Sequence, residues 1–228
     1  MITTQSTPIY VVDSSTSVRE DYCRLLQPLG YRVEAFADAE SFLKHVDPHT
    51  AGCLIIDTAL PGMSGAALYV HLHSENSPLA VIFSVSHGDI DTAVSLIKRG
   101  AVNYGLKPIR EQTLLDSINQ ALRLSQAHLA KIEAKALAAG RLSKLTLRET
   151  QVLHQLVAGT HYAIIATNLG ITKRTVEAHR RRIMDKLSAK TLPQLLQELA
   201  QVGWPSNTLD RRAEVVRQSL LRPAITET

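Results

Sequence analysis

The chain has 228 residues, of which 45% are hydrophobic and 20% are charged, a composition that indicates globular domains and excludes a disordered tail protein. The formal net charge is +4, but residues 1–125 carry 9 Lys and Arg against 13 Asp and Glu, whereas residues 126–228 carry 16 against 8. The two halves are therefore −4 and +8, and the second half is expected to meet a polyanion.

The composition also predicts where the protein acts. No apolar run reaches about 18 residues, so no transmembrane helix is expected. The first ten residues lack the basic and apolar regions of a signal peptide. Cys23 and Cys53 are too few for a disulfide framework. We therefore predict a cytoplasmic protein without a membrane partner.

The first half alternates short apolar runs with amphipathic stretches. Strands are predicted at Ile9–Val12, Tyr31–Ala35, Cys53–Ile56, Ala80–Phe83 and Val102–Leu106. Helices are predicted at Ser17–Leu29, Ala39–Val46, Gly65–Ser74 and Asp89–Arg99, and from Glu111 onward. Ser17 and Glu20 form a capping-box pattern. This alternation predicts an α/β doubly wound domain of five parallel strands, with its site at their carboxyl ends.

Three charged residues follow strands of this predicted sheet. Asp13 ends the first strand, Asp57 ends the third, and Lys107 follows the fifth. The carboxyl ends of parallel strands converge on one crevice, so these side chains are expected to meet. Such a cluster could accept a phosphoryl group, hold a divalent cation, or form a static network of ion pairs.

A long helix is predicted to follow the fifth strand, because no Pro or Gly interrupts the chain between Ile109 and Ala139. Apolar or small residues recur along it at alternating spacings of three and four, at positions 115, 118, 122, 125, 129, 132, 136 and 139. This is the seam of a coiled coil, weakened by Ser125, Ala136 and Ala139. An amphipathic last helix followed by a polar linker is the alternative.

The second half reads as four helices. Thr146 and Glu149 form a capping box at the start of the first helix, which Gly159 ends. The others are predicted at Ala163–Leu169, from Thr172 to about Leu187, and from Thr191 to near Gly203. The turn Leu169-Gly-Ile-Thr172 is typical of a helix-turn-helix.

Residues 8–125 resemble the CheY-like receiver domain of two-component response regulators. The motifs that carry the resemblance are Tyr10-Val-Val-Asp13, Cys53-Leu-Ile-Ile-Asp57, Leu60-Pro-Gly-Met-Ser-Gly65, His87-Gly-Asp89, Gly100-Ala-Val and Leu106-Lys-Pro108. The resemblance implies that Asp57 accepts phosphate from a sensor histidine kinase, and that Lys107 bonds the phosphoryl group. It also implies a Mg²⁺ ion on acids that follow the first strand, and an aromatic switch residue at Tyr104.

Two positions depart from this family pattern. Ser14 stands where the family has a second acid, and a hydroxyl is a poor, uncharged ligand for Mg²⁺. Val85 stands where the family has Thr or Ser, and Ser84 is expected on the opposite face of the strand. We therefore predict no required cofactor, a weak Mg²⁺ site on Asp13 and Asp57, and weakened or absent phosphorylation of Asp57.

Two other interpretations of the acid cluster stay open at this stage. One is a conventional response regulator that phosphorylation of Asp57 activates. The other, more remote, is a phosphatase with Asp57 as its nucleophile, although no carboxylate stands two residues later as a general acid. We predict a protein that is not an enzyme.

Residues 145–202 resemble the LuxR/FixJ-type DNA-binding domain. The motifs are Leu145-Thr-Leu-Arg-Glu149, Val157-Ala-Gly159, Ile165-Ala166, Leu169-Gly-Ile-Thr172, Thr175-Val-Glu-Ala-His179 and Ile183-Met-Asp-Lys-Leu187. The resemblance implies that the third helix lies in the major groove and faces bases with Glu177, Ala178 and Arg181. Phosphate contacts are expected from Lys173, Arg174, Thr175, His179, Arg182 and Lys186.

One departure concerns the helix before the turn, where Tyr162-Ala163 replaces the usual Asn-Lys and removes a phosphate-contacting Lys. The family uses its fourth helix for dimerisation, which implies a homodimer on a pseudo-palindromic DNA operator. A module that binds RNA or a membrane surface through the basic helix is the rival interpretation.

The whole chain is identified as a DNA-binding transcriptional regulator of the FixJ/NarL class. We predict a receiver over residues 1–124, a helical linker over 125–142 and a helix-turn-helix domain over 143–204. The tail, 205–228, holds one predicted short helix, Arg211–Leu220.

Overall fold

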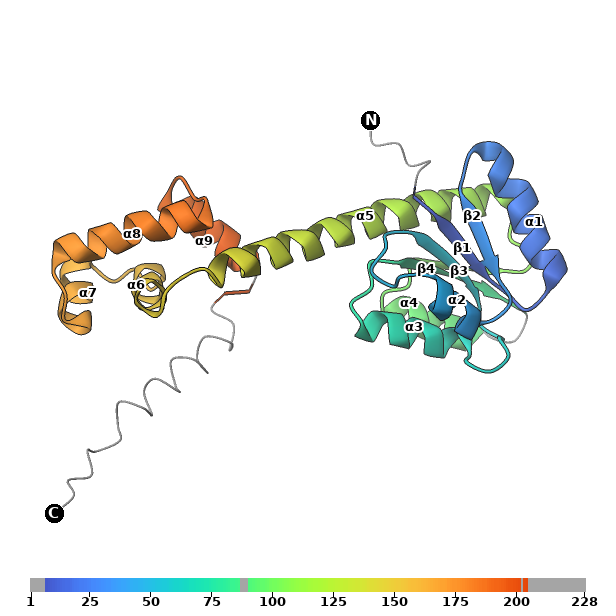
Figure 1. The fold of residues 1–228 in the computed structure, drawn as a ribbon. Coiled ribbons are helices and arrows are strands. Elements are labelled where there is room, and N and C mark those ends of the chain that lie inside the picture. Colours follow the sequence, from blue (N-terminus) through green and yellow to red (C-terminus); the bar gives the residue numbers. More distant parts are fainter. Residues whose placement is uncertain (1–6, 87–89, 202, 205–228) are drawn as a thin grey trace, which may run out of the picture. The chain divides into compact units, whose positions relative to one another are not determined.

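A computed structural model of the chain describes residues 7–86, 90–201 and 203–204 (Figure 1). The described residues form two compact units, which are divided between Lys131 and Ile132. The predicted motif at His87–Asp89 and the tail helix at Arg211–Leu220 lie outside the described residues. Within the described ranges, no helix is both long and apolar enough to cross a membrane.

The first unit is built on a five-stranded parallel sheet with the strand order β2-β1-β3-β4-β5. The strands are β1 Ile9–Val12, β2 Val33–Phe36, β3 Cys53–Asp57, β4 Ala80–Val85 and β5 Asn103–Leu106. The prediction of a doubly wound parallel sheet is confirmed. All five carboxyl ends consequently lie along one edge of the sheet, where Asp57 pairs in register with Ser84.

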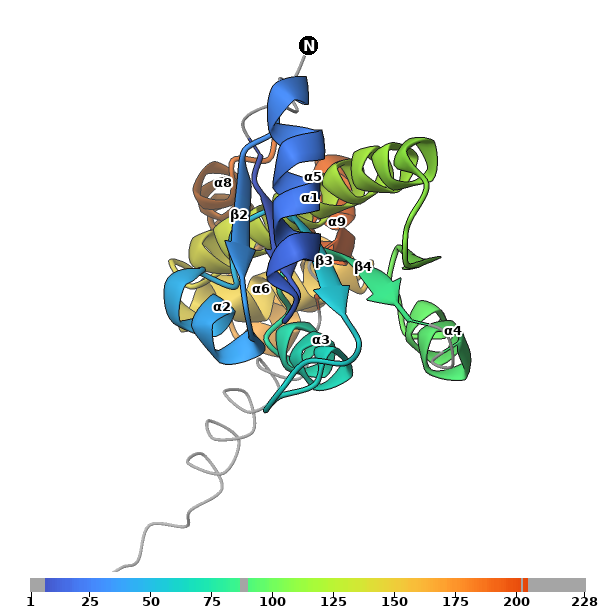
Figure 2. The ribbon, with the colours of Figure 1, turned by 90° about the vertical axis from the view of Figure 1, so that its right-hand side faces the viewer.

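Helices cover both faces of this sheet (Figures 1 and 2). The helices of the first unit are α1 Thr16–Leu26, α2 Ala39–His45, α3 Gly65–Ser74, α4 Ile90–Lys98 and α5 Glu111–Leu142, with a 3₁₀ turn, η2, at Gln27–Leu29. Side chains from α1 and α5 pack on the face that carries Ile9 and Ile55. Side chains from α2, α3 and α4 pack on the other face, against Leu54 and Phe83.

The start of α1 differs from the prediction. The capping box expected at Ser17 and Glu20 is wrong, because α1 already begins at Thr16 and Ser17 lies within it. The residue before the helix is Ser15, and its side chain does not cap a backbone N–H group. Its hydroxyl instead lies 3.0 Å from that of Ser17, and its own N–H group donates to Asp13.

Helix α5 confirms the prediction of one uninterrupted helix, but the first half of the proposed coiled-coil seam is wrong. Ile118, Leu122 and Ser125 are buried in the first unit, because α5 uses this stripe to cover the sheet. The Ser125 hydroxyl accepts a hydrogen bond from the N–H group of Gly52 over 2.8 Å. Further along the seam, Ala136 and Ala139 are exposed. The predicted alternative, an amphipathic last helix of the receiver, describes the first part of α5.

The second unit contains α6 Leu147–Val157, α7 Tyr162–Leu169, α8 Lys173–Leu187 and α9 Leu192–Gln201. The capping box of Thr146 and Glu149 is confirmed. The predicted cap Thr172 accepts from the N–H group of Thr175, and Gly170 adopts φ +62° between α7 and α8. That left-handed conformation suits glycine, so this residue permits the tight turn of the helix-turn-helix.

One glycine sets how closely α3 approaches the acid cluster. A Cβ atom on Gly65 would lie 2.1 Å from the carbonyl oxygen of Asp57 and 2.8 Å from Cγ2 of Ile56. No real side chain tolerates such contacts with backbone, so only glycine fits at the start of α3. The close approach holds the loop after β3 against the end of its own strand.

Candidate functional site

The three charged residues predicted to converge do meet at the carboxyl edge of the sheet. The Lys107 Nζ atom lies 2.6 Å from Asp13 Oδ2 and 2.7 Å from Asp57 Oδ2. Both carboxylates are buried, and the lysine side chain is 20% exposed. One ammonium group therefore bridges two acids that come from neighbouring strands.

The second oxygen of each carboxylate is also engaged. Asp13 Oδ1 accepts from the N–H group of Ser15 over 2.9 Å, and Asp57 Oδ1 accepts from that of Ala59 over 3.1 Å. Arg19 adds a cation beside the first loop, since its guanidinium donates to the backbone oxygens of Asp13 and Ser14 over 2.6 and 3.0 Å. The backbone around Asp13 is thus held by contacts from α1.

The electrostatics of the cluster favour a charged lysine. Burial lowers the pKa of Lys107, but its hydrogen bonds to Asp13 and Asp57 outweigh that effect and hold the pKa above its ordinary value. The ammonium group therefore stays protonated between the two acids.

These residues do not fit a conventional Mg²⁺ site. Across the part of the chain that the structure describes, no group of three or more His, Cys, Asp or Glu side chains could hold a metal. Ser14 is exposed, and it has no carboxylate to complete the set. A hard divalent cation prefers several oxygen ligands, yet here Lys107 already occupies one oxygen of each acid.

At the end of β4, Val85 has no hydroxyl that could interact with the acids. Val85 is fully buried among apolar side chains on the α2, α3 and α4 face. Ser84 is buried on the other face, where its hydroxyl lies 3.2 Å from that of Tyr22 on α1. The predicted switch residue Tyr104 lies half-buried against the first of these faces.

Tyr22 is part of this site although the sequence patterns did not single it out. Burial raises the pKa of its phenol, the hydrogen bond with Ser84 lowers it, and the charges of Lys107, Asp13 and Asp57 also act on it. Burial prevails, so the pKa of Tyr22 is raised, and the phenol is linked to the cluster through Ser84, which pairs in register with Asp57. A tyrosine in the middle of an amphipathic helix gives no signal that distinguishes this role from core packing.

The second predicted site is the exposed side of α8. Val176, Ile183 and Leu187 are buried, and they anchor the opposite side of the helix in the core. Four residues recur at the helical spacing i, i+3, i+4 and i+7 and are all exposed: Arg174, Glu177, Ala178 and Arg181. Lys173 and Arg182 are exposed beside this stripe. The three residues predicted to face bases thus share one accessible surface.

Lys186 has a different environment from the other predicted phosphate contacts. Its Nζ atom lies 2.7 Å from Glu149 Oε2 and 3.1 Å from the backbone oxygen of Lys144. The same Glu149 oxygen accepts from the N–H and hydroxyl groups of Thr146. Burial opposes ionisation of Glu149, but the bonds from Lys186 and Thr146 prevail and hold its pKa below the ordinary value. Lys186 therefore joins α8 to α6.

The remaining predicted contacts are less accessible. Thr175 is half-buried, and its hydroxyl lies 2.8 Å from that of Thr172. His179 is half-buried, and its Nδ1 atom is enclosed without a hydrogen-bond partner. Tyr162 packs against the core of the second unit, and Ala163 is exposed.

A further contact supports the turn between α7 and α8, because Arg148 on α6 donates to the last carbonyl group of α7 over 3.0 Å.

Known proteins share both parts of this arrangement. Residues 9–119 match the response regulator receiver domain, and residues 143–199 match the luxR family of bacterial regulatory proteins. The transcriptional regulatory protein FixJ of Azorhizobium caulinodans is 34% identical over 87% of this chain and 94% of its own length. The chain belongs to the FixJ-type response regulators. It is accordingly a DNA-binding transcriptional response regulator.

Other members of this family agree over most of the chain. The transcriptional regulatory protein TdiR of Thauera aromatica is 35% identical over 85% of this chain and 86% of its own length. The solved structure of the response regulator StyR covers 86% of this chain and 98% of its own, with 38% identity and a TM-score of 0.75. This FixJ-type regulator therefore has relatives that span both of its units.

The cation in the receiver pocket is expected to be essential for stability. Lys107→Met leaves two buried carboxylates side by side, and we expect the free energy of unfolding to fall by about 3–5 kcal/mol. Urea denaturation of the full chain, followed by circular dichroism, measures this loss. Adding Asp13→Asn removes one uncompensated charge and should restore part of the stability. An unchanged unfolding midpoint in Lys107→Met would contradict the proposed bridge.

The ion pair of Glu149 predicts an acid-sensitive second unit. The pKa of Glu149 is lower in the folded than in the unfolded chain. The ionised carboxylate therefore stabilises the fold at a pH above its ordinary pKa of 4.5, and this stabilisation is lost as the pH falls through the pKa of the folded state. Glu149→Gln should lower the free energy of unfolding by about 1–3 kcal/mol at neutral pH. On acidification, this variant should lose less stability than the unaltered chain.

Trp204, the single tryptophan of the chain, is buried in the second unit, so its fluorescence during urea unfolding measures this effect. Glu177→Gln, which changes an exposed glutamate on α8, is the matched control and should retain the acid dependence of the unaltered chain. Identical acid dependence in Glu149→Gln and the unaltered chain would count against this role of the ion pair.

Proposed function

We propose that this regulator binds a pseudo-palindromic DNA operator as a homodimer, with α8 in the major groove. The observation that carries the proposal is the exposed stripe of Arg174, Glu177, Ala178 and Arg181, which follows a tight turn at Gly170. Arg181 suits the O6 and N7 acceptors of guanine, Glu177 can accept from cytosine N4, and Ala178 suits a thymine methyl group. These side chains would read the sequence of the operator.

Phosphate contacts in this proposal come from exposed or half-exposed groups on α8. Lys173, Arg174 and Arg182 are exposed and carry the charge, and Thr175 and His179 lie beside them half-buried. Lys186 is left out, because a contact with DNA phosphate would compete with its bonds to Glu149 and Lys144. Such contacts fix the position of a protein on DNA but do not read its sequence.

We further propose that the receiver controls dimerisation and DNA binding with little or no Mg²⁺-dependent phosphorylation of Asp57. Three features support this: Lys107 bridges both acids, Ser14 supplies no carboxylate, and Val85 supplies no hydroxyl. A sensor histidine kinase is the partner in the alternative of a conventional regulator that phosphorylation activates. A phosphatase is disfavoured, because Ala59 stands where a general acid would be needed.

The variant Arg181→Ala tests whether this side chain recognises the base sequence of the operator. We expect this change to cost about 1–3 kcal/mol of binding free energy at the specific operator, because a bidentate contact with guanine is lost. Binding to unrelated duplexes should change little. Operators selected from random duplexes with the full chain, followed by fluorescence anisotropy titrations, measure both quantities.

Arg182→Ala is the matched control for this experiment. It removes a phosphate contact on the same helix and should weaken specific and non-specific binding alike. Equal losses on specific and unrelated DNA in Arg181→Ala would overturn the assignment of this residue as a base reader. Binding of the unaltered chain without preference among duplexes would instead favour the rival module.

Phosphorylation control is tested with beryllofluoride and millimolar Mg²⁺. We expect the dimerisation equilibrium of the unaltered chain, measured by sedimentation velocity, to stay unchanged, because position 14 carries no acid and position 85 carries no hydroxyl. Ser14→Asp combined with Val85→Thr restores both groups, and this variant should respond. A shift in the unaltered chain that Asp57→Asn abolishes would instead establish conventional phosphorylation.

A further inference from the structure

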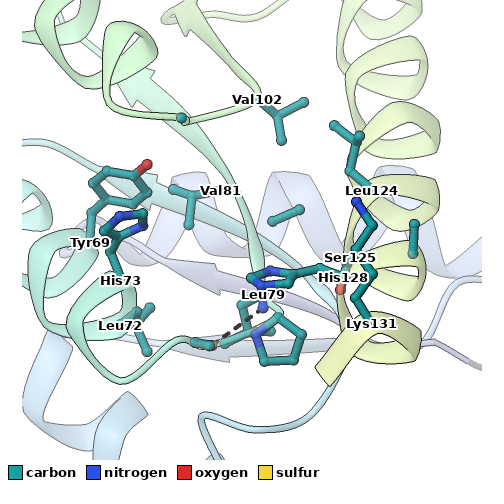
Figure 3. A pocket seen from close by; sticks show the side chains of 15 residues that line it. Tyr69, Leu72, His73, Leu79, Val81, Val102, Leu124, Ser125, His128 and Lys131 are labelled. Atoms are coloured by element: carbon teal, nitrogen blue, oxygen red, sulfur yellow. Dashed lines mark hydrogen bonds between the residues drawn. The ribbon is translucent and has the colours of Figure 1, made fainter. Parts of the chain in front are cut away.

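A second hollow lies at the opposite end of the strands from Asp57. It is bounded by the end of α3, the starts of β4 and β5, and one stripe of α5, and its volume is about 340 Å³ (Figure 3). This size is within the range of small-molecule sites in proteins. All of its lining residues belong to the first unit.

The floor and walls of this hollow are largely apolar. Leu72, Leu79 and Val81 are buried at its base, and Leu124, 49% exposed, lies at its mouth. The rings of Tyr69 and His73 stand beside each other on the α3 side, with their centroids 6.0 Å apart and their planes inclined by 32° (Figure 3). Such a surface favours a ligand with an aromatic or other apolar body.

The hollow is lined by two histidines and a lysine but by no acid. His73 comes from α3, whereas His128 and Lys131 come from α5 on the other side (Figure 3). No Asp or Glu lines the hollow, although residues 1–125 have a net charge of −4. In the part of the chain that the structure describes, no hydrogen bond or ion pair engages the side-chain nitrogens of these three residues.

Each of the other polar side chains of the hollow already makes a hydrogen bond within the protein. The Tyr69 hydroxyl donates to the backbone oxygen of Arg99, and the Ser77 hydroxyl donates to that of Pro48. The Ser125 hydroxyl accepts from Gly52. Among the lining side chains, the polar groups without a hydrogen bond are therefore basic nitrogens beside an apolar floor, a chemistry that favours an anion with an apolar body.

We propose that this hollow is a binding site for a small amphipathic organic anion, such as an aromatic carboxylate or sulfonate. The anionic group lies between Lys131 and the imidazoles, and the apolar body lies against Leu79 and Val81. Five lining residues come from two turns of α5, namely Leu124, Ser125, Ala127, His128 and Lys131. A bound ligand thereby joins α5 to α3 without contact with Asp57.

The probe that tests the site is 1-anilinonaphthalene-8-sulfonate, titrated into the full chain by fluorescence. N-phenyl-1-naphthylamine has the same ring system without the sulfonate, and we expect it to bind at least about tenfold more weakly. The double variant His128→Gln with Lys131→Gln should weaken the sulfonate by about tenfold and leave the neutral amine unchanged. Lys135→Gln, an exposed lysine of α5 outside the hollow, should alter neither.

A second variant and a location measurement keep the proposal falsifiable. Leu124→Glu changes an exposed residue, so it should fold, and its carboxylate at the mouth should repel the sulfonate. Hydrogen exchange at saturating sulfonate should show protection of residues 124–131 and of the start of β4. Equal affinity for both probes, unchanged sulfonate affinity in the double variant, or protection confined to other segments each overturns the proposal.

Discussion

The receiver pocket depends on one ammonium group held between two buried carboxylates. Lys107 reaches from the chain after β5 to Asp57 at the end of β3 and to Asp13 at the end of β1. Only a parallel sheet brings these three ends to one edge, and only a close approach at Gly65 keeps the loop after β3 in place. Any cation that enters this pocket must compete with Lys107 for the same oxygens, which links the stability of the pocket to its capacity for phosphorylation.

The second unit uses a similar ion pair, with a buried carboxylate, for a different purpose. Lys186 binds Glu149, which also completes the capping box of α6, so one carboxylate starts a helix and fastens another. The charge of +8 in the second half of the sequence therefore overstates the charge available to DNA. Lys186 is engaged within the protein, whereas the positive charge of Arg174 and Arg181 lies on the exposed stripe of α8, where these residues flank Glu177 and Ala178.

Sequence patterns predicted the helix caps in the second unit that depend on residues close together in the chain. The cap at Thr172 and the capping box of Thr146 depend on groups three residues apart, and both are present. Contacts between distant residues left no such pattern: 62 residues separate Tyr22 from Ser84. The stripe on α5 was ambiguous for another reason, because alternating spacings of three and four serve a coiled coil and a sheet-covering helix equally. Ser17 does not cap α1, because the helix already begins at Thr16, after a loop in which Asp13 accepts from the N–H group of Ser15.

Helix α5 is where these features meet. Its buried stripe ends at Ser125, whose hydroxyl fixes the helix to Gly52 at the amino ends of the strands. The next turn carries His128 and Lys131, and the helix then continues without interruption to Leu142, shortly before the first helix of the DNA-binding domain. Gln126, the residue after Ser125, donates from its side chain to the Thr7 hydroxyl over 2.9 Å, and a ligand in the hollow would add contacts to this part of α5. The proposed ligand would thus give the receiver, besides Asp57, a second place at which a signal can act, and this place lies on the helix that leads to the DNA-binding domain.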